Sequence, residues 1–356
     1  MNASLDDPAR RHLLRNGLGL AGAALLATPL ARAAATASAV TQVSFLSRQA
    51  GADALARTPG DTYYSTMRLL ESRARTNSPL KGLSIPEARI AVRDYEAAAV
   101  RQFTPAEADA IRLATERLQP VLAERAPLYA RTPWSFIKLD DEAEGGMPHT
   151  RGAHIVLPEG MAAAFARLGR DFAADQPSRR AHSLMNLLVH EQTHVLERAH
   201  PERFEPLITQ VFGFTRMSPA PSTPWLDVHE FENPDGPEVV WAFPLDQVGG
   251  TGWVMPHLVV PDLAQPRMPQ DFQSIGVEVR RTDDGWQVVE EGGVPRARDL
   301  DEVRGYHAHF PFPDEDFHPN EIAAVTLSHW ILRDVPDIDS RPLMPAVAAW
   351  AKTGLA

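Results

Sequence analysis

The residues best suited to chemistry lie in one short stretch, LLVHEQTHVLERAHP at residues 187–201, which holds three histidines and two glutamates. His190 and His194 are four residues apart, and on a helix this spacing puts both imidazoles on one face, where they can bind a single ion. Glu191 lies in the same turn and can reach a water molecule on that ion. The stretch therefore predicts a zinc (Zn²⁺) site with Glu191 as general base, because zinc lowers the pKa of its water to about 7.

A match to His-Glu-x-x-His also arises by chance on helices, so the surroundings of the motif matter. The flanking residues are apolar, and buried histidines without partners are costly. These flanks favour metal binding over a coincidental match. A catalytic zinc site then needs a third protein ligand and keeps one position open for water.

Two candidates for the third ligand lie in the same stretch. Glu197 is about two helical turns beyond His190, too far along the axis to share its ion, so it either orients His194 or is a polar edge of the helix. His200 has the spacing of the last histidine in the metzincin peptidases, but Glu197 replaces the glycine that turns the chain in that class. Because the helix breaks only at Pro201, His200 is more simply a histidine at the helix C-terminus.

Glu321 is the third candidate, and it lies in the stretch FHPNEIAAVTLSHWIL at residues 317–332. It follows His318 and Pro319 at the start of a predicted helix with an apolar side. Acidic residues are common in first helical turns because they complement the helix dipole. A glutamate from a second helix can also complete a set of two histidines and one carboxylate around zinc.

These motifs together resemble the gluzincin side of the zincin metallopeptidases, and in particular bacterial exported proteins. The resemblance covers roughly residues 130–335. Its motifs in this chain are His190-Glu191-Gln192-Thr193-His194, Val211-Phe212-Gly213-Phe214, Asn233-Pro234-Asp235 and His318-Pro319-Asn320-Glu321.

The resemblance implies a zincin-like fold, with His190, His194 and Glu321 as zinc ligands and Glu191 as base. It also implies a strand that lines the cleft and pairs with an extended substrate, and HTRGAHIVLP at residues 149–158 is the candidate. Some members of the family carry an aspartate four residues after the ligand glutamate, where this chain has a valine. The residue that orients a ligand histidine must then come from elsewhere, and Glu197 is one possibility.

Hydrolysis of an amide also needs a group that stabilises the oxyanion beside the metal. Tyr306, His307, His309 and His318 precede the Glu321 helix and are the candidates. We take Tyr306 and His307 as the predicted catalytic pair, although histidines in loops often only satisfy local hydrogen bonds.

The patterning along the chain predicts an α+β protein, with N-terminal helices and a β-rich insertion between the HExxH helix and the Glu321 helix. Strands are expected at residues 134–139 and 151–158, a hairpin at 277–291, and helices at 161–172 and about 183–198. The expected regions are a signal peptide at 1–33, a linker at 34–60, a helical region at 61–130, and a catalytic domain at 131–356 with its insertion at about 215–310.

The N-terminus predicts export. Arg10 and Arg11 precede a short apolar run and the small-residue end Ala31-Arg32-Ala33, which resembles a twin-arginine signal, with an ordinary secretory signal as the alternative. The mature protein would be periplasmic or secreted, without a membrane anchor. The 356 residues contain no cysteine and carry a formal charge of -11, which disfavours nucleic acid as a partner and excludes thiolate chemistry.

The leading hypothesis is an exported zinc metallopeptidase acting on a peptide or protein substrate. One alternative within the same class is a metzincin-like peptidase that uses His200 as its third ligand. Another, from a different class, is a non-catalytic binding or scaffold protein that zinc stabilises. The sequence leaves the substrate and the oligomeric state open.

Overall fold

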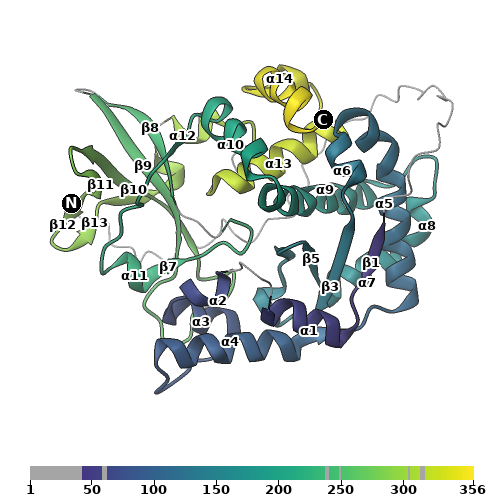
Figure 1. Ribbon diagram of the computed structural model, residues 1–356, viewed down its shortest axis with the longest axis horizontal. Helices are drawn as coiled ribbons and strands as arrows, with labels where there is room; N and C mark the ends of the chain where they lie inside the picture. The colour runs from purple at the N-terminus through teal and green to yellow at the C-terminus, as the bar shows by residue number, and fades with distance from the viewer. Residues whose placement is uncertain (1–41, 58–61, 237–239, 248–249, 304, 313–316) are drawn as a thin grey trace.

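The computed structural model describes residues 42–57, 62–236, 240–247, 250–303, 305–312 and 317–356 (Figure 1). Helices and strands are mixed throughout, which confirms the predicted α+β class. No helix within the described ranges is long and apolar enough to cross a membrane. The predicted signal peptide, residues 1–33, lies outside these ranges.

The sheet nearest the N-terminus has the strand order β1-β3-β5-β4, and β2 also pairs with β3. The predicted strand at residues 134–139 is confirmed as β3, and its side chains alternate between the two faces as strand geometry requires. Trp134 and Phe136 belong to the main core, whereas Ile137 and Leu139 belong to a second cluster on the other face. The strands are β1 (Val43–Phe45), β2 (Val100–Arg101), β3 (Trp134–Leu139), β4 (His149–Arg151) and β5 (His154–Pro158).

The prediction of a linker over residues 34–60 is wrong for residues 43–57. β1 pairs in parallel with β3, and helix α1 (Arg48–Arg57) follows it. The ring of Phe45 packs against Phe103 and Phe136, so a few apolar side chains suffice to fix a segment whose composition is otherwise small and polar. The N-terminal segment therefore shares one sheet with the region predicted as catalytic.

Residues 149–158 form a β-hairpin rather than the single strand that was predicted. β4 and β5 pair antiparallel, with Thr150 opposite Ile155. A two-residue turn joins the two strands, and its Gly152 has the positive φ that such a turn favours. β5 pairs with β3, which leaves β4 as the edge strand. β4 is therefore one edge strand of this sheet, and β1 at the other end of the order is the second.

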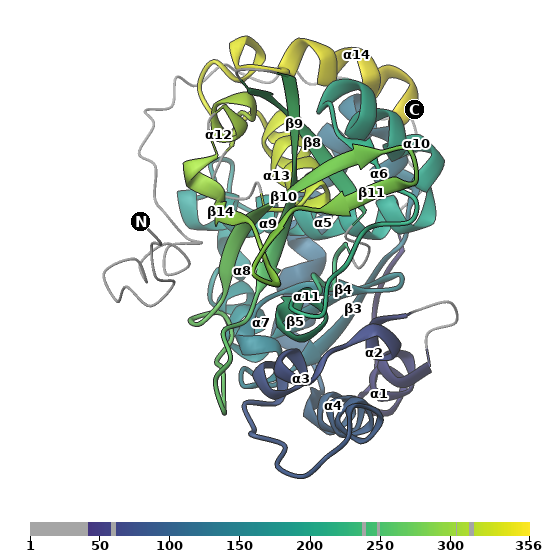
Figure 2. The same cartoon turned by 90° about the vertical axis from the view of Figure 1, so that its left-hand side faces the viewer.

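Helices cover both faces of this sheet. α1 and the N-terminal helices gather at one end of the molecule, and the C-terminal helix lies at the opposite end (Figures 1 and 2). The predicted helix at 161–172 is broken into two short helices. The helices up to residue 172 are α2 (Tyr63–Thr66), α3 (Leu69–Thr76), α4 (Ile85–Ala99), α5 (Pro105–Arg125), α6 (Pro127–Arg131), α7 (Glu159–Arg167) and α8 (Gly169–Phe172).

The predicted β-rich insertion forms a second, larger sheet with the strand order β11-β10-β9-β8-β6. The expected hairpin at 277–291 is confirmed by the pairing of β10 with β11. Two short strands, β7 and β14, pair with β9 and β10 at its margins. The strands of this sheet are β6 (Thr215–Arg216), β7 (Glu230–Phe231), β8 (Trp241–Gln247), β9 (Gly250–Val259), β10 (Gln273–Thr282), β11 (Gly285–Val288) and β14 (Ala297–Asp299), whereas β12 (Glu290–Glu291) and β13 (Val294–Pro295) form a separate two-stranded sheet.

Two long helices on either side of the insertion pack against each other and complete the core. They are α9 (Arg179–Ala199), which starts four residues before the predicted helix, and α13 (Pro319–Leu332). Their apolar residues belong to one large cluster together with the sheet and the C-terminal helix. The remaining helices are α10 (Pro201–Pro206), α11 (Leu226–His229), α12 (Tyr306–His309) and α14 (Met344–Gly354).

Candidate metal centre

Helix α9 carries the two histidines of the HExxH motif. Its first turn is capped by Ser178, whose hydroxyl accepts a hydrogen bond from the Ala181 amide. His190 and His194 follow on the face that packs against α13, and His194 is fully buried. Both imidazoles therefore extend from α9 toward α13.

Helix α13 brings Glu321 to the same place from 131 residues further along the chain. The His318 side chain accepts a hydrogen bond from the Asn320 amide and caps the helix, and Pro319 occupies its first position. Glu321 therefore lies in the first turn and is buried. A capped, proline-led helix start of this kind fixes the direction in which the carboxylate leaves the backbone.

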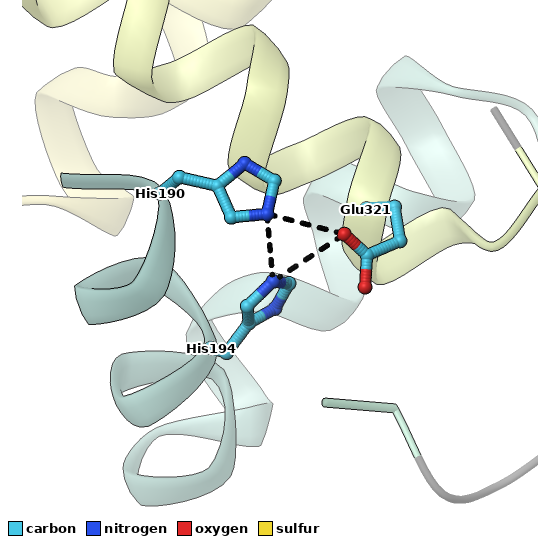
Figure 3. A group of neighbouring side chains, drawn as sticks. All are labelled: His190, His194 and Glu321. Carbon is cyan, nitrogen blue, oxygen red and sulfur yellow. Dashed lines mark hydrogen bonds and ion pairs between the residues drawn. The ribbon is translucent and has the colours of Figure 1, made fainter. Parts of the chain in front are cut away.

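His190, His194 and Glu321 converge with one ligand atom each, as Figure 3 shows. The two Nε2 atoms are 3.2 Å apart, and Glu321 Oε2 lies 3.1 Å from His190 Nε2 and 3.5 Å from His194 Nε2. Tetrahedral zinc, with bonds of about 2.0–2.1 Å, would place its ligand atoms about 3.3–3.4 Å apart. The donor types and their spacing fit a zinc ion.

The protonation of His194 also suits a metal ligand. Its Nδ1 lies 3.1 Å from Glu197 Oε2, and a proton held there on Nδ1 would leave Nε2 free for a metal once the ion displaces the second proton of the charged ring. Glu197 is held in turn by the Asn320 amide, at 3.0 Å. The orienting role considered for Glu197 thus agrees with its contacts, and Asn320 extends it.

Asn233 is a residue of the site that the sequence reasoning did not single out as functional. Its side-chain amide donates to Glu321 Oε1, and its own Oδ1 accepts the backbone N–H of Asp235 at 3.0 Å. The first bond fixes the carboxylate so that Oε2 is the oxygen facing the histidines. The Asn233-Pro234-Asp235 motif was part of the family resemblance, but nothing in the sequence assigned it this contact.

Glu191, the predicted general base, is 3% exposed, and its Oε2 has no hydrogen-bond partner. Burial, reinforced by the negative charge of Asp235, raises the pKa of Glu191 well above its ordinary value. A carboxylate with a raised pKa is a stronger base, which suits a group that accepts a proton.

The charges of the converging side chains shift the pKa values of Glu321 and His194 in opposite directions. Burial by itself raises the pKa of Glu321, but the charge of His194 and the hydrogen bonds from both histidines outweigh it and hold this pKa well below its usual value. Burial works against protonation of His194, and the charges of Glu321 and Asp235 outweigh it, so the pKa of His194 is raised. Glu321 is therefore a carboxylate, which is the form that binds a metal.

The predicted catalytic pair Tyr306 and His307 lies in other surroundings. Tyr306 is fully buried and packs in an aromatic cluster. His307 forms an ion pair with Asp301 at 3.0 Å between Nε2 and Oδ1. The rings around Tyr306 are those of Phe214, Phe243 and Phe310.

The other histidines considered are also accounted for. His309 donates from Nε2 to the Phe212 carbonyl, whereas His318 caps α13 beside the site. His200 ends α9, and its side chain, 35% exposed, faces Glu202. It lies six residues beyond His194, about 9 Å along the helix axis, and does not belong to the metal-competent group among the described residues.

Comparison of this chain with protein-family models, with curated proteins and with solved structures finds no match in any of the three. The geometry and chemistry of the side chains therefore carry the functional argument.

The hydrogen bond from Asn233 to Glu321 leads us to predict that Asn233 contributes to zinc affinity. Asn233→Ala is expected to lower zinc affinity by about 10–100-fold, because the Glu321 carboxylate loses the amide that orients it. Competition with a chelator of known affinity measures the change. Asn186→Ala is the matched control, since Asn186 lies one turn before His190 on α9 but donates to Asp334 instead. Equal zinc affinity in the two variants would contradict the orienting role.

Proposed function

We propose that this protein is a zinc-dependent metallopeptidase of gluzincin type, with a zincin-like catalytic domain. The observation that carries the proposal is the convergence of His190 Nε2, His194 Nε2 and Glu321 Oε2 at separations of 3.1–3.5 Å, from two helices far apart in the sequence. Two imidazoles and one carboxylate, next to an unpaired buried glutamate, are the ligand set and base of hydrolytic zinc enzymes.

Zinc held by these three side chains would supply Lewis-acid polarisation of a substrate carbonyl and a water molecule of lowered pKa. The side chains of this protein then orient the zinc ligands and move the proton of the reaction. Glu197 holds the proton of His194 on Nδ1, and Asn233 fixes the Glu321 carboxylate. Glu191 accepts the proton of the attacking water at its unpaired Oε2 and passes it to the leaving amine.

The experiment that tests this function is Glu191→Gln in the zinc-loaded chain. We expect zinc binding to be retained and hydrolysis of a mixed peptide library to fall by about 10²–10⁴-fold, the usual contribution of a general base. Glu202→Gln is the matched control, because Glu202 is exposed on α10 and should leave hydrolysis unchanged. Cleavage by the Glu191→Gln chain at the rate of the original chain would contradict the proposed role of Glu191 as general base, and with it the peptidase proposal.

A second candidate function is a binding or scaffold protein that zinc stabilises without turnover. The observation in its favour is burial, since Glu191, His194 and Glu321 are all nearly inaccessible to solvent. This candidate predicts that zinc raises the melting temperature of the chain, and that no peptide in the library is cleaved by either the original chain or the Glu191→Gln variant.

A further inference from the structure

Residues 233–236 form a compact turn next to the metal centre. The Gly236 amide donates to the Asn233 carbonyl at 3.2 Å, and the Asn233 side chain accepts the Asp235 amide at 3.0 Å. Asparagine, proline and glycine occupy the first, second and fourth positions, where they are favoured in a type I turn. The sequence thus specifies this small unit, the Asn233–Gly236 turn, independently of the sheet that follows it.

The turn is seated on the start of α13. Asn233 donates to Glu321 Oε1, and Gly236 approaches so closely that an added Cβ would lie 2.5 Å from the His318 ring. Asp235 is near enough for its charge to act on both Glu191 and His194. One short turn therefore contacts or faces a metal ligand, the predicted base and the cap of the ligand helix.

The same turn occupies the β4 edge of the first sheet. Asp235 Oδ1 accepts both the backbone N–H and the hydroxyl of Thr150 in β4, at 2.7 and 2.5 Å. Arg198 donates to the Thr150 carbonyl at 3.2 Å and to the Pro234 carbonyl at 2.8 Å, and it lies 3.6 Å from the Asp235 carboxylate. The outward N–H and C=O of an edge strand are the groups that an added strand would use. At Thr150 the N–H is already hydrogen-bonded to Asp235 and the C=O to Arg198.

The strand that leads into the turn is held by the N-terminal helices. Arg68, the residue before α3, forms ion pairs with Glu230 at 3.0 Å and with Glu232 at 3.4 Å. Arg75 of α3 donates to the Glu232 carbonyl at 2.6 Å. These contacts tie β7 and the residue before Asn233 to a segment about 160 positions earlier in the chain.

We propose that the Asn233–Gly236 turn is a built-in cover, which closes the metal centre and takes the place of an extended peptide on β4. The turn has to leave Thr150 before such a peptide can pair with the strand beside the metal. The identity of the ligand as a peptide rests on the proposed function, whereas the cover itself does not.

The test uses zinc exchange in both directions. A cover limits the rate at which zinc leaves and the rate at which it enters, so opening it speeds both and leaves the affinity nearly unchanged. Asp235→Ala removes the acceptor for Thr150 and is expected to raise zinc release to a chelator and zinc uptake by the metal-free chain by at least about 10-fold each. The Thr150 amide should also exchange its hydrogen faster.

Three further variants separate this effect from a weakened site. Asp227→Ala removes a carboxylate from an exposed position of α11 and should change neither rate. Asn233→Ala should raise the release rate more than the uptake rate, because it removes the amide that orients a ligand while the contacts of Asp235 with Thr150 on β4 remain. Arg68→Gln loosens the anchor of β7 and should shift both rates in the same direction as Asp235→Ala.

Unchanged exchange rates in Asp235→Ala, or faster release alone, would overturn the cover. Faster exchange in both directions supports it, and hydrolysis of a dye-quenched unfolded protein then tests the ligand. Cleavage that increases in Asp235→Ala supports the peptide as well. Faster exchange with no cleavage in any variant keeps the cover and removes the peptidase function.

Discussion

Glu321→Ala is expected to lose zinc binding by more than about 100-fold, whereas His200→Ala keeps the affinity of the original chain. Removing a ligand should exceed the 10–100-fold effect of residues that only orient ligands. Glu321 Oε2 lies 3.1 Å from His190 Nε2, while His200 ends α9 and faces Glu202. Titration of both purified variants with zinc, in competition with a chelator, measures the difference.

Because Glu321 is buried in the first turn of α13, its replacement could also weaken the fold. Circular dichroism of the metal-free variants separates the two effects, and a folded Glu321→Ala chain that binds no zinc supports the assignment. The opposite pattern, with zinc lost in His200→Ala and retained in Glu321→Ala, would move the protein to the metzincin arrangement.

Arg75→Met is expected to destabilise the protein by about 3–5 kcal/mol, the cost of leaving buried charges without their partner. Arg75 is fully buried and donates to Glu71 at 2.8 Å, to Glu144 and to the Glu232 carbonyl. Its removal leaves two carboxylates in the core without a cation. Urea unfolding at pH 7 measures the loss.

The pH dependence of this loss identifies its cause. In the original chain, burial tends to raise the pKa of Glu144, but the Arg75 charge and several hydrogen bonds hold it at about 2. Stability from this group is therefore present above about pH 4.5 and is lost only as the pH falls through 2. In Arg75→Met the unpaired carboxyl should be protonated when folded, so the difference between the chains should narrow from pH 7 toward pH 4.

Arg93→Met is the matched control, because Arg93 pairs with Asp94 on the surface and should cost less than about 1 kcal/mol. A loss in Arg75→Met that stays constant between pH 7 and pH 4 would point to a packing defect instead of an unpaired charge.

The local part of the candidate metal centre could be predicted from the sequence because helix geometry fixes it. Once residues 179–199 form a helix, His190 and His194 must lie on one face of it, and Glu191 must lie in the same turn as His190. Glu321 was one of three candidates, since no local rule relates two residues 131 positions apart. The family resemblance favoured it, and the packing of α9 against α13 brings it to the histidines.

The parts that the sequence did not predict depend on contacts between distant segments. Asn233 approaches Glu321 because contacts between distant segments, among them the pairing of β7 with β9, hold the turn in place. Tyr306 was expected near the metal from its position before α13, but its ring is drawn into the aromatic cluster of the insertion. Residues 43–57 looked like a linker because their few apolar side chains are widely spaced, yet parallel pairing with β3 orders them.

The most direct test of the proposed zinc site is anomalous diffraction at the zinc edge from crystals of the zinc-loaded chain. We predict one strong peak at about 2.0–2.1 Å from the Nε2 atoms of His190 and His194 and from a carboxylate oxygen of Glu321. A peak bound through His200, or zinc bound only at surface positions, would contradict it.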